Sequence, residues 1–176
     1  MGATQTAGFG SASGSLWRGL TAAPVAHDGG DIVIMETLRQ QYPYFHRLRV
    51  RYSEIDGQGI VFNAHYLTYF DVALTEFMRD RDFDFDAMVR NEGLDFHLVK
   101  SLVEYKLPIR QDQQIDIGVR AARIGNSSIS WHLGIFGADD ETCLACGEIV
   151  WVCSRVGEHK SHPLPANFRN ALPAPQ

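Results

Sequence analysis

An apolar helix predicted over residues 66–78 sets the first limit on the fold of this chain. Its apolar side chains recur every three or four residues and are Tyr66, Phe70, Ala73 and Phe77, with Leu67, Leu74 and Met78 beside them. A face this broad indicates a helix buried on most of its sides, because an ordinary surface helix keeps a wide polar face. Asn63 stands where an N-cap residue is expected. The other elements must therefore enclose this helix.

Most other segments with a clear period are predicted to be strands. Leu48, Val50 and Tyr52 alternate with three arginines ahead of the helix, which is the two-residue period of a half-buried strand. After a short second helix over residues 85–91, ended by Gly93, only strands follow. They are predicted over residues 94–107, as one long strand or a bent pair, and over residues 115–121, 129–135 and 142–155.

The apolar alternation slips once, near Val99 and Lys100, where a β-bulge is predicted. The order of elements is one strand, one long helix and then a run of antiparallel strands. This order predicts an α+β fold in which a single antiparallel sheet wraps around one central helix.

The ends of the 176-residue chain differ in composition from its middle. Residues 1–38 are rich in Gly, Ala, Ser and Thr near their start, so we expect a disordered extension there. An alternative is that Met35 is the true start; a targeting peptide fits poorly, since the first 27 residues carry a single basic residue. We expect one domain over residues 39–171 and a tail over residues 172–176.

Composition excludes several classes of protein. Sixteen basic and 21 acidic residues give a net charge of -5 without a basic stripe, which argues against a nucleic-acid partner. Apolar runs such as 149–153 are far too short to span a membrane. Three cysteines, an odd number, argue against a disulfide framework and favour a cytoplasmic location.

A zinc site is suggested by Cys143-x2-Cys146 followed by His159-x2-His162. The two cysteines have opposite parity in a predicted strand, so we expect them to point to opposite faces of the sheet. The histidine spacing is also one residue short of the usual range. We therefore expect no metal and interpret the cysteines as small core residues.

The segment between the first strand and the long helix has the chemistry of a possible acyl-transfer site. Asp56 lies on a loop just before the helix, and Gly57 and Gly59 allow that loop to approach a ligand closely. Unpaired backbone N–H groups at a helix start carry partial positive charge and can polarise a carbonyl. On spacing alone, an acidic turn residue followed by an N-cap is the interpretation that is favoured.

The same segment resembles the signature of the 4-hydroxybenzoyl-CoA thioesterase type of acyl-CoA thioesterases, in the hotdog-fold superfamily. The matching residues are Asp56, Gly59, Ile60, Val61, Phe62, Tyr66, Leu67, Tyr69 and Phe70. The similarity continues through 103–110, 115–119, 123–128, 145–147 and 164–165, and covers about residues 43–171. It implies a hotdog fold, homodimers or homotetramers with sites at the subunit interface, and hydrolysis of an acyl-CoA without metal or bound cofactor.

The resemblance also assigns roles by position. It makes Asp56 the catalytic carboxylate, as nucleophile or as general base, and the backbone N–H of Asn63 the group that polarises the thioester carbonyl. In one branch of the family the position of Asn63 is a histidine, so this chain lacks that group, and we interpret His65 as a residue near the site. The expected substrate-binding residues are Gly59, Ile60, Val61, Phe62, His65 and Tyr66.

A polar turn is a candidate for binding CoA. It contains Arg123, Asn126, Ser127 and Ser128, and an arginine suits the phosphates of CoA. A solvated hairpin end is the alternative interpretation of the same residues.

Two other functions fit the same fold. An enoyl-CoA hydratase typically has a histidine five residues after the aspartate, where this chain has Val61, so it is disfavoured. A non-catalytic acyl-CoA-binding or assembly module is the other alternative, because a fold does not by itself imply a function.

Deleting residues 1–34 is expected to leave enzymatic activity unchanged, because every candidate site residue lies between Asp56 and Ser128. The measurement compares thiol release from an acyl-CoA by the full and shortened chains at equal concentration. A large loss of activity in the shortened chain would contradict this domain boundary.

Overall fold

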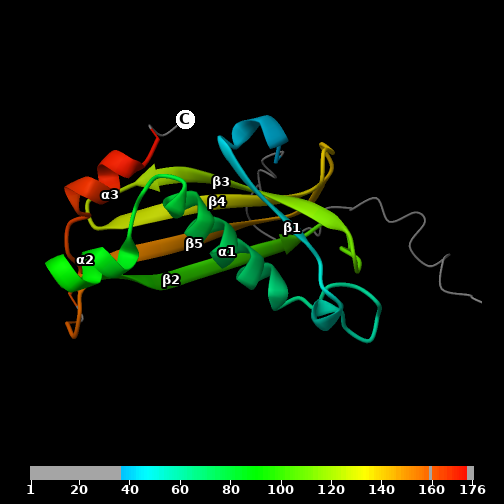
Figure 1. The fold of residues 1–176 in the computed structure, drawn as a ribbon, viewed down its shortest axis with the longest axis horizontal. Helices are drawn as coiled ribbons and strands as arrows, with labels where there is room; N and C mark the ends of the chain where they lie inside the picture. Colours follow the sequence, from blue (N-terminus) through cyan, green and yellow to red (C-terminus); the bar gives the residue numbers. More distant parts are fainter. Residues whose placement is uncertain (1–36, 159, 174–176) are drawn as a thin grey trace, which may run out of the picture. The chain divides into compact units, whose positions relative to one another are not determined.

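Five antiparallel strands form one sheet in the order β1-β3-β4-β5-β2 (Figure 1). The computed structural model describes residues 37–158 and 160–173, so most of the predicted extension, including Met35, and His159 lie outside the described residues. The strands are β1 (Tyr44–Arg49), β2 (Leu94–Tyr105), β3 (Gln114–Ile124), β4 (Ser128–Gly137) and β5 (Cys143–Arg155). The helices are η1 (Arg39–Gln41), η2 (Tyr52–Glu54), α1 (His65–Arg79), α2 (Phe85–Glu92) and α3 (Ala166–Ala171).

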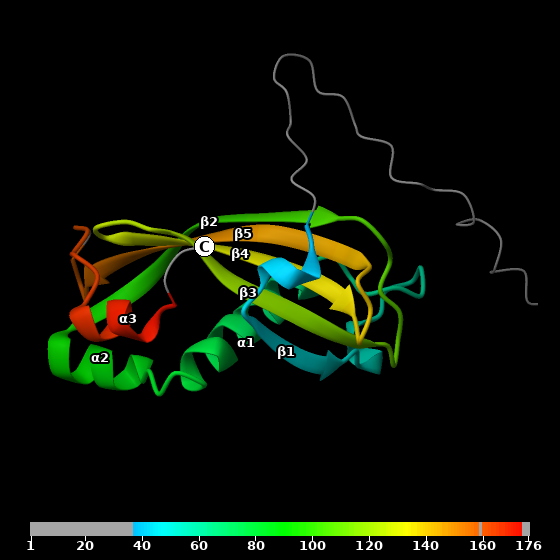
Figure 2. The ribbon, with the colours of Figure 1, turned by 90° about the horizontal axis from the view of Figure 1, so that it is seen from above.

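The long helix α1 lies against one face of this sheet (Figure 2). Its buried residues are Tyr66, Tyr69, Phe70, Ala73, Leu74, Phe77 and Met78, which confirms most of the predicted face. Leu67 is an exception and is 37% exposed. The predicted α+β fold with one sheet around a central helix is confirmed. None of the described helices is long and apolar enough to cross a membrane.

A glycine allows the helix to approach the sheet closely. A Cβ atom at Gly147 would lie 2.6 Å from the ring of Phe70 and would also overlap the carbonyl oxygen of Leu102. Neither neighbour can move easily, since one is a ring in the core and the other is backbone of the adjacent strand β2. The contact between α1 and β5 therefore requires a residue without a side chain at this position.

The predicted N-cap is wrong by one residue. The N-cap of α1 is Ala64, whose φ of -66° and ψ of -25° are already helical, and no side chain caps the helix. A turn precedes it, in which the N–H of His65 donates to the carbonyl of Phe62 at 2.9 Å. This backbone turn supplies the entry to the helix in place of the Asn63 side chain.

The predicted bulge in β2 is confirmed, because the register with β5 shifts between Leu98 and Lys100. The second helix also ends as predicted, with Gly93 in the left-handed conformation at φ 64°. Another bulge, between β4 and β5, has no counterpart in the sequence-based prediction. There Ile135 pairs with Ala145 but Phe136 pairs with Cys143.

The N-terminal part of the described chain packs on the opposite face of the sheet from α1. Gly118 and Gly134 pair across β3 and β4, and a Cβ atom at either would lie 2.6 Å from Tyr42. The Tyr42 hydroxyl makes a 2.8 Å hydrogen bond with Nδ1 of His132. The tyrosine ring therefore occupies the space left by two glycines.

An ion-pair cluster fastens this segment to the sheet. The Asp116 carboxylate is 2% exposed and accepts hydrogen bonds from Arg47 at 2.7 and 2.9 Å and from Arg39 at 2.5 Å. The two bonds from Arg47, followed by the one from Arg39, lower the pKa of Asp116 to about 2 despite its burial. The ionised form is thus strongly favoured in the folded chain.

We expect Asp116→Asn to lower the free energy of unfolding at pH 7 by about 2 kcal/mol, because the depressed pKa stores that much stabilisation. In the parent chain this stabilisation is complete above about pH 4 and is lost as the pH falls toward 2. Urea unfolding at pH 7, 4 and 2.5 measures both effects. Asp139→Asn, at an exposed partner of Arg47, is the control and should change stability by less than about 0.5 kcal/mol. An unchanged acid dependence in Asp116→Asn would contradict the assignment.

Candidate active site

Asp56 begins a tight loop at one end of the sheet. An isolated bridge between Ile55 and Val61 closes the loop. The N–H of Asp56 donates to the carbonyl of Ile60 at 2.9 Å, and the N–H of Gly59 donates to the carbonyl of Asp56 at 3.0 Å. Gly59 has a φ of 75°, a conformation that a side chain would strain. The loop conformation therefore depends on this glycine.

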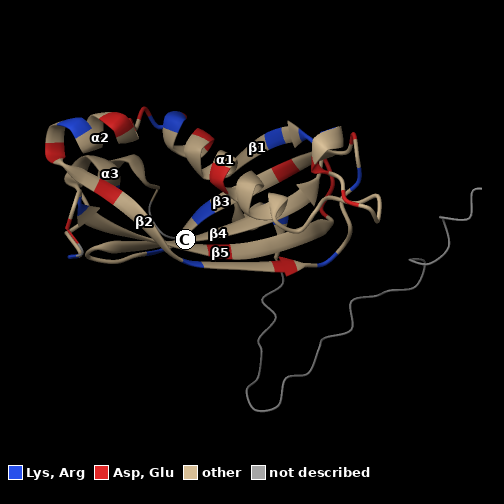
Figure 3. Cartoon of the chain, turned by 90° about the horizontal axis from the view of Figure 1, so that it is seen from below, with Lys and Arg blue, Asp and Glu red and all other residues tan. Residues whose placement is uncertain are grey.

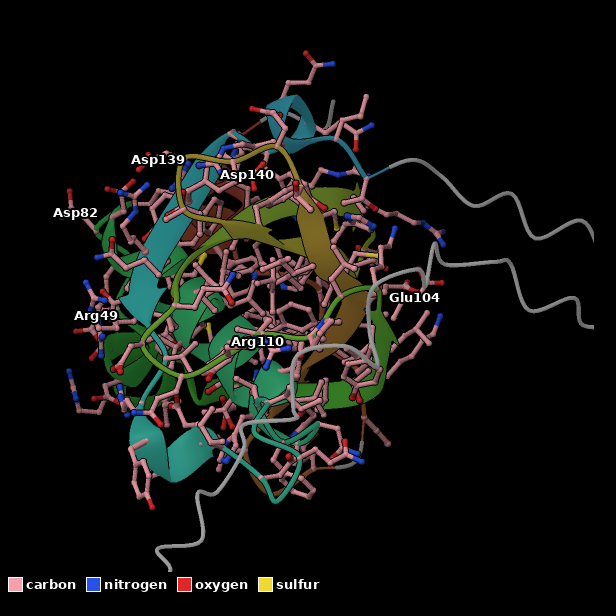
Figure 4. All side chains as sticks on the ribbon, turned by 90° about the vertical axis from the view of Figure 1, so that its right-hand side faces the viewer. Arg49, Asp82, Glu104, Arg110, Asp139 and Asp140 are labelled. Carbon is pink, nitrogen blue, oxygen red and sulfur yellow. The ribbon has the colours of Figure 1, made fainter. Side chains whose placement is uncertain are left out.

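The Asp56 carboxylate is half-buried and has one hydrogen bond, from the N–H of Gln58 to Oδ1 at 2.7 Å. Among the described residues no basic side chain pairs with it. The second oxygen is thus available to a water molecule or to an electrophilic carbon. Figure 4 looks onto this end of the molecule, where Arg49 and Arg110 are labelled.

Two backbone N–H groups at the start of α1 have no acceptor in the described part of the chain. The N–H of Val61 donates to Ile109 and that of Phe62 donates to the carbonyl of Glu54, each at 2.9 Å. The next two, those of Asn63 and Ala64, donate to nothing within residues 37–158 and 160–173. Both lie at the positive end of a 15-residue helix. This is the arrangement that binds an oxyanion.

Aromatic side chains surround the helix start. The Tyr66 ring is buried and meets Tyr105 edge-on at 4.8 Å between centroids, while the Tyr105 hydroxyl donates to the carbonyl of Asn63 at 3.3 Å. Burial, together with the charges of Tyr105 and Asp56, raises the pKa of Tyr66. Phe62 is 46% exposed and meets the His65 ring at 6.1 Å. The site therefore has an apolar rim beside its carboxylate.

The structure brings together most of the predicted substrate-binding residues. Gly59, Ile60, Phe62, His65 and Tyr66 belong to the loop or to the first turn of α1. Val61 and Tyr66 differ from the other four, because they are 2% and 3% exposed and belong to the hydrophobic core.

The candidate CoA-binding turn lies at the other end of the sheet. The loop of Asp56 adjoins the start of β3, where the N–H of Val50 donates to Gln113, whereas Arg123 and residues 126–128 lie where β3 ends and β4 begins. The 11 residues of β3 separate them by about 35 Å at the usual strand rise. Within one chain, Asp56 and this turn therefore do not form a common site.

Tyr69 was predicted only as a matching residue of the signature, and Glu54 was not predicted as a site residue. The Tyr69 hydroxyl donates to Oε2 of Glu54 at 2.7 Å, and both residues are buried. A tyrosine on the apolar face of the helix was the available signal, since a buried hydroxyl needs a partner. Which of the upstream polar residues supplies that partner is decided by the fold of the loop.

The prediction that Cys143 and Cys146 point to opposite faces of the sheet is wrong. The bulge in β5 omits Leu144 from the pairing, so Cys143 opposes Phe136 and Cys146 opposes Gly134, which places both cysteines on one face of the sheet. The thiol of Cys146 donates to Glu104 at 3.2 Å. No group of three or more potential metal ligands occurs among the described residues, and His159 is outside them, so the absence of a metal stays a prediction.

Comparison with known proteins agrees with this architecture. The family model described as "Thioesterase superfamily" matches residues 58–144. A "Putative esterase" from Aquifex aeolicus (strain VF5) is 31% identical over 97 residues, which are 55% of this chain and 75% of that protein. The "Acyl-CoA thioester hydrolase YbgC" of Escherichia coli O6:H1 is 30% identical over 121 residues, which are 69% of this chain and 89% of that protein.

A solved structure gives the same result for the fold. The crystal structure of the PA5185 protein from Pseudomonas aeruginosa PAO1 has a TM-score of 0.69 and 29% sequence identity, and the match covers 77% of this chain and 92% of the other. The match therefore includes nearly the whole of that protein. This chain belongs to the thioesterase superfamily and has its hotdog fold.

Proposed function

We propose that this thioesterase-superfamily protein is an enzyme that hydrolyses an acyl-CoA to a free acid and CoA. The observation that carries the proposal is the half-buried carboxylate of Asp56 beside the free N–H groups of Asn63 and Ala64. A relative with 30% identity is named an acyl-CoA thioester hydrolase, which supports this class of substrate. No bound cofactor is required for the reaction.

The thioester carbonyl oxygen binds to the N–H groups of Asn63 and Ala64, which stabilise the negative charge that develops on it. In one route, Asp56 attacks the carbonyl carbon and the C–S bond breaks. CoA then leaves as a thiolate that takes up a proton, and water hydrolyses the acyl-aspartate anhydride. In the other route, Asp56 removes a proton from water, and this water attacks the carbonyl directly. Both routes consume one water molecule per thioester.

Two features of the loop favour hydrolysis over the alternatives. Residue 61, where the hydratase pattern has a histidine, is a valine buried in the core. An assembly module needs neither a carboxylate with a free oxygen nor unpaired N–H groups beside it. A cytoplasmic location remains a prediction from the cysteine content, and Cys143, Cys146 and Cys153 are all free thiols.

We further propose a homodimer formed along β2. This strand is at an edge of the sheet and carries few charges (Figure 3), namely Asp95, Lys100 and Glu104. Large apolar side chains are exposed on it or just after it: Leu98, Val99, Leu102, Tyr105 and Leu107. An apolar edge with few charges pairs readily with another strand. A second copy of β2 is a suitable cover, because antiparallel pairing satisfies both edges at once.

In such a dimer, the polar turn of one chain lies near Asp56 of the other chain, where it can bind CoA. The turn lies beside the Leu94 end of β2, since the N–H of Cys153 donates to Ser127 and Cys153 pairs with Phe96. Tyr105, at the other end of β2, contacts the helix start beside Asp56. Antiparallel pairing of two β2 strands sets the Leu94 end of one chain beside the Tyr105 end of the other. Arg123 and residues 126–128 of the second chain then lie at the end of the sheet that carries Asp56.

We expect Asp56→Ala to lower kcat for acyl-CoA hydrolysis by at least about 100-fold, because it removes the nucleophile or general base. Release of free thiol from a panel of acyl-CoAs measures the rate. Asp86→Asn, at an exposed position on α2, is the control and should retain full activity. An Asp56→Ala variant as fast as the parent would contradict the role of Asp56. Binding of CoA esters by both, with hydrolysis by neither, would instead support a binding module.

We expect the parent chain to be a dimer or a larger even oligomer, and Val99→Lys with Leu102→Lys to shift it to monomer, because two charges would be buried at the proposed interface. Size-exclusion chromatography with light scattering measures the mass. Gln40→Lys, at an exposed position in η1 ahead of β1, the strand at the opposite edge of the sheet, is the control and should not change it. A monomeric parent chain would contradict the β2 interface.

A further inference from the structure

We propose that Glu54 and Tyr69 are positioning residues that hold the Asp56 loop in register with the N-terminus of α1. The inference rests on the proposed function, because it assigns the two residues to the alignment of the reacting groups. We assign neither residue a direct part in the reaction. Both act through the loop and the helix that carry those groups.

The Glu54 carboxylate is the centre of the arrangement. It is 8% exposed, and its Oε2 accepts a hydrogen bond from the Tyr69 hydroxyl at 2.7 Å and another from the N–H of Arg51 at 2.8 Å. The Arg51 guanidinium is 3.9 Å from the other oxygen. A buried carboxylate is costly unless its hydrogen bonds are made. These contacts therefore hold Glu54 in a single place.

The backbone of Glu54 holds the base of the loop. Its carbonyl accepts the N–H of Phe62 at 2.9 Å, one residue before the free N–H of Asn63. The next pair along the loop is the bridge between Ile55 and Val61, and Asp56 follows Ile55 directly. A displacement of Glu54 would thus move the carboxylate of Asp56 and the N–H of Asn63 together.

Tyr69 connects this base to the helix. Its side chain is 2% exposed and lies one turn into α1. Burial and the neighbouring Glu54 carboxylate raise the pKa of Tyr69, so the hydroxyl keeps its proton and remains a donor. Among the described residues, this is the only side-chain hydrogen bond between residues 51–62 and α1. The position of the loop along the helix therefore depends on it.

The first test is Tyr69→Phe, which removes the hydroxyl and keeps the ring. We expect kcat for acyl-CoA hydrolysis to fall about 10- to 100-fold, because a small misplacement of reacting groups has effects of that size. KM should change by less than about 3-fold, since binding of the substrate is not the step affected. Tyr42→Phe is the matched control: it also deletes a buried hydroxyl with a 2.8 Å hydrogen bond, but on the opposite face of the sheet. The free energy of unfolding of Tyr42→Phe should fall by a similar amount, and its kcat should stay at the parent value.

The second test uses Glu54. Glu54→Gln keeps an oxygen that can accept both hydrogen bonds now made by Oε2, so it should stay within about 3-fold of the parent kcat. In Glu54→Ala, kcat should fall by as much as in Tyr69→Phe. In the double variant Glu54→Ala/Tyr69→Phe, kcat should fall no further than in the slower single variant, because both changes delete the same interaction. A double variant in which the two reductions of kcat multiply would overturn the proposal. A Tyr69→Phe variant with the parent kcat would also overturn it.

Amide hydrogen exchange separates this proposal from the proposed reaction. The N–H groups of Asp56 and Phe62 are both hydrogen-bonded within the loop, and Tyr69→Phe should accelerate their exchange at least about 10-fold while Tyr42→Phe leaves it unchanged. If the parent chain hydrolyses no acyl-CoA, the proposed function fails and the exchange data alone decide on the positioning role. Equal exchange in Tyr69→Phe and the parent chain would overturn it.

Discussion

The burial of α1 against the sheet is the contact on which the rest of the molecule depends. Seven of its side chains are buried, and Gly147 allows the ring of Phe70 to reach β5. A helix held this closely has a fixed N-terminus, and two of the N–H groups at that end are free among the described residues. The same packing that stabilises the core thus presents fixed hydrogen-bond donors beside Asp56. Fold and proposed chemistry have one physical origin.

Buried polar groups lie on both faces of the sheet and stabilise different parts of the molecule. On the outer face, Tyr42 lies over two glycines, and the Asp116 cluster ties residues 39–47 to β3. On the helix face, Glu54 and Tyr69 join the loop of Asp56 to α1. Each region buries a carboxylate and satisfies it with specific donors, which restricts the chain to one arrangement. The first fastens an end of the domain, and the second is proposed to align a reaction.

Elements with a local signal were predicted well from the sequence. The helix ending at Gly93 and the bulge near Val99 follow from residue types a few positions apart. The first strand was misplaced, because β1 ends at Arg49 and Tyr52 lies in η2 with 81% of its surface exposed. The bulge at Leu144 was missed because apolar side chains occupy both parities of β5, so no slip is visible in the pattern. The N-cap was misplaced because a backbone turn formed by residues 62–65 replaces the side-chain cap.

Periodicity and glycine placement predict the α+β class, the central helix and the loop that carries Asp56, because these signals act over short distances. Which groups contact one another depends on the folded domain as a whole. Glu54 lies 15 residues from Tyr69, and Asp56 and Arg123 lie at opposite ends of β3. Such pairings depend on how the helix crosses the sheet and on strand register, which are set by packing over the whole domain. The exposed edge of β2 likewise became visible only once the strand order was known.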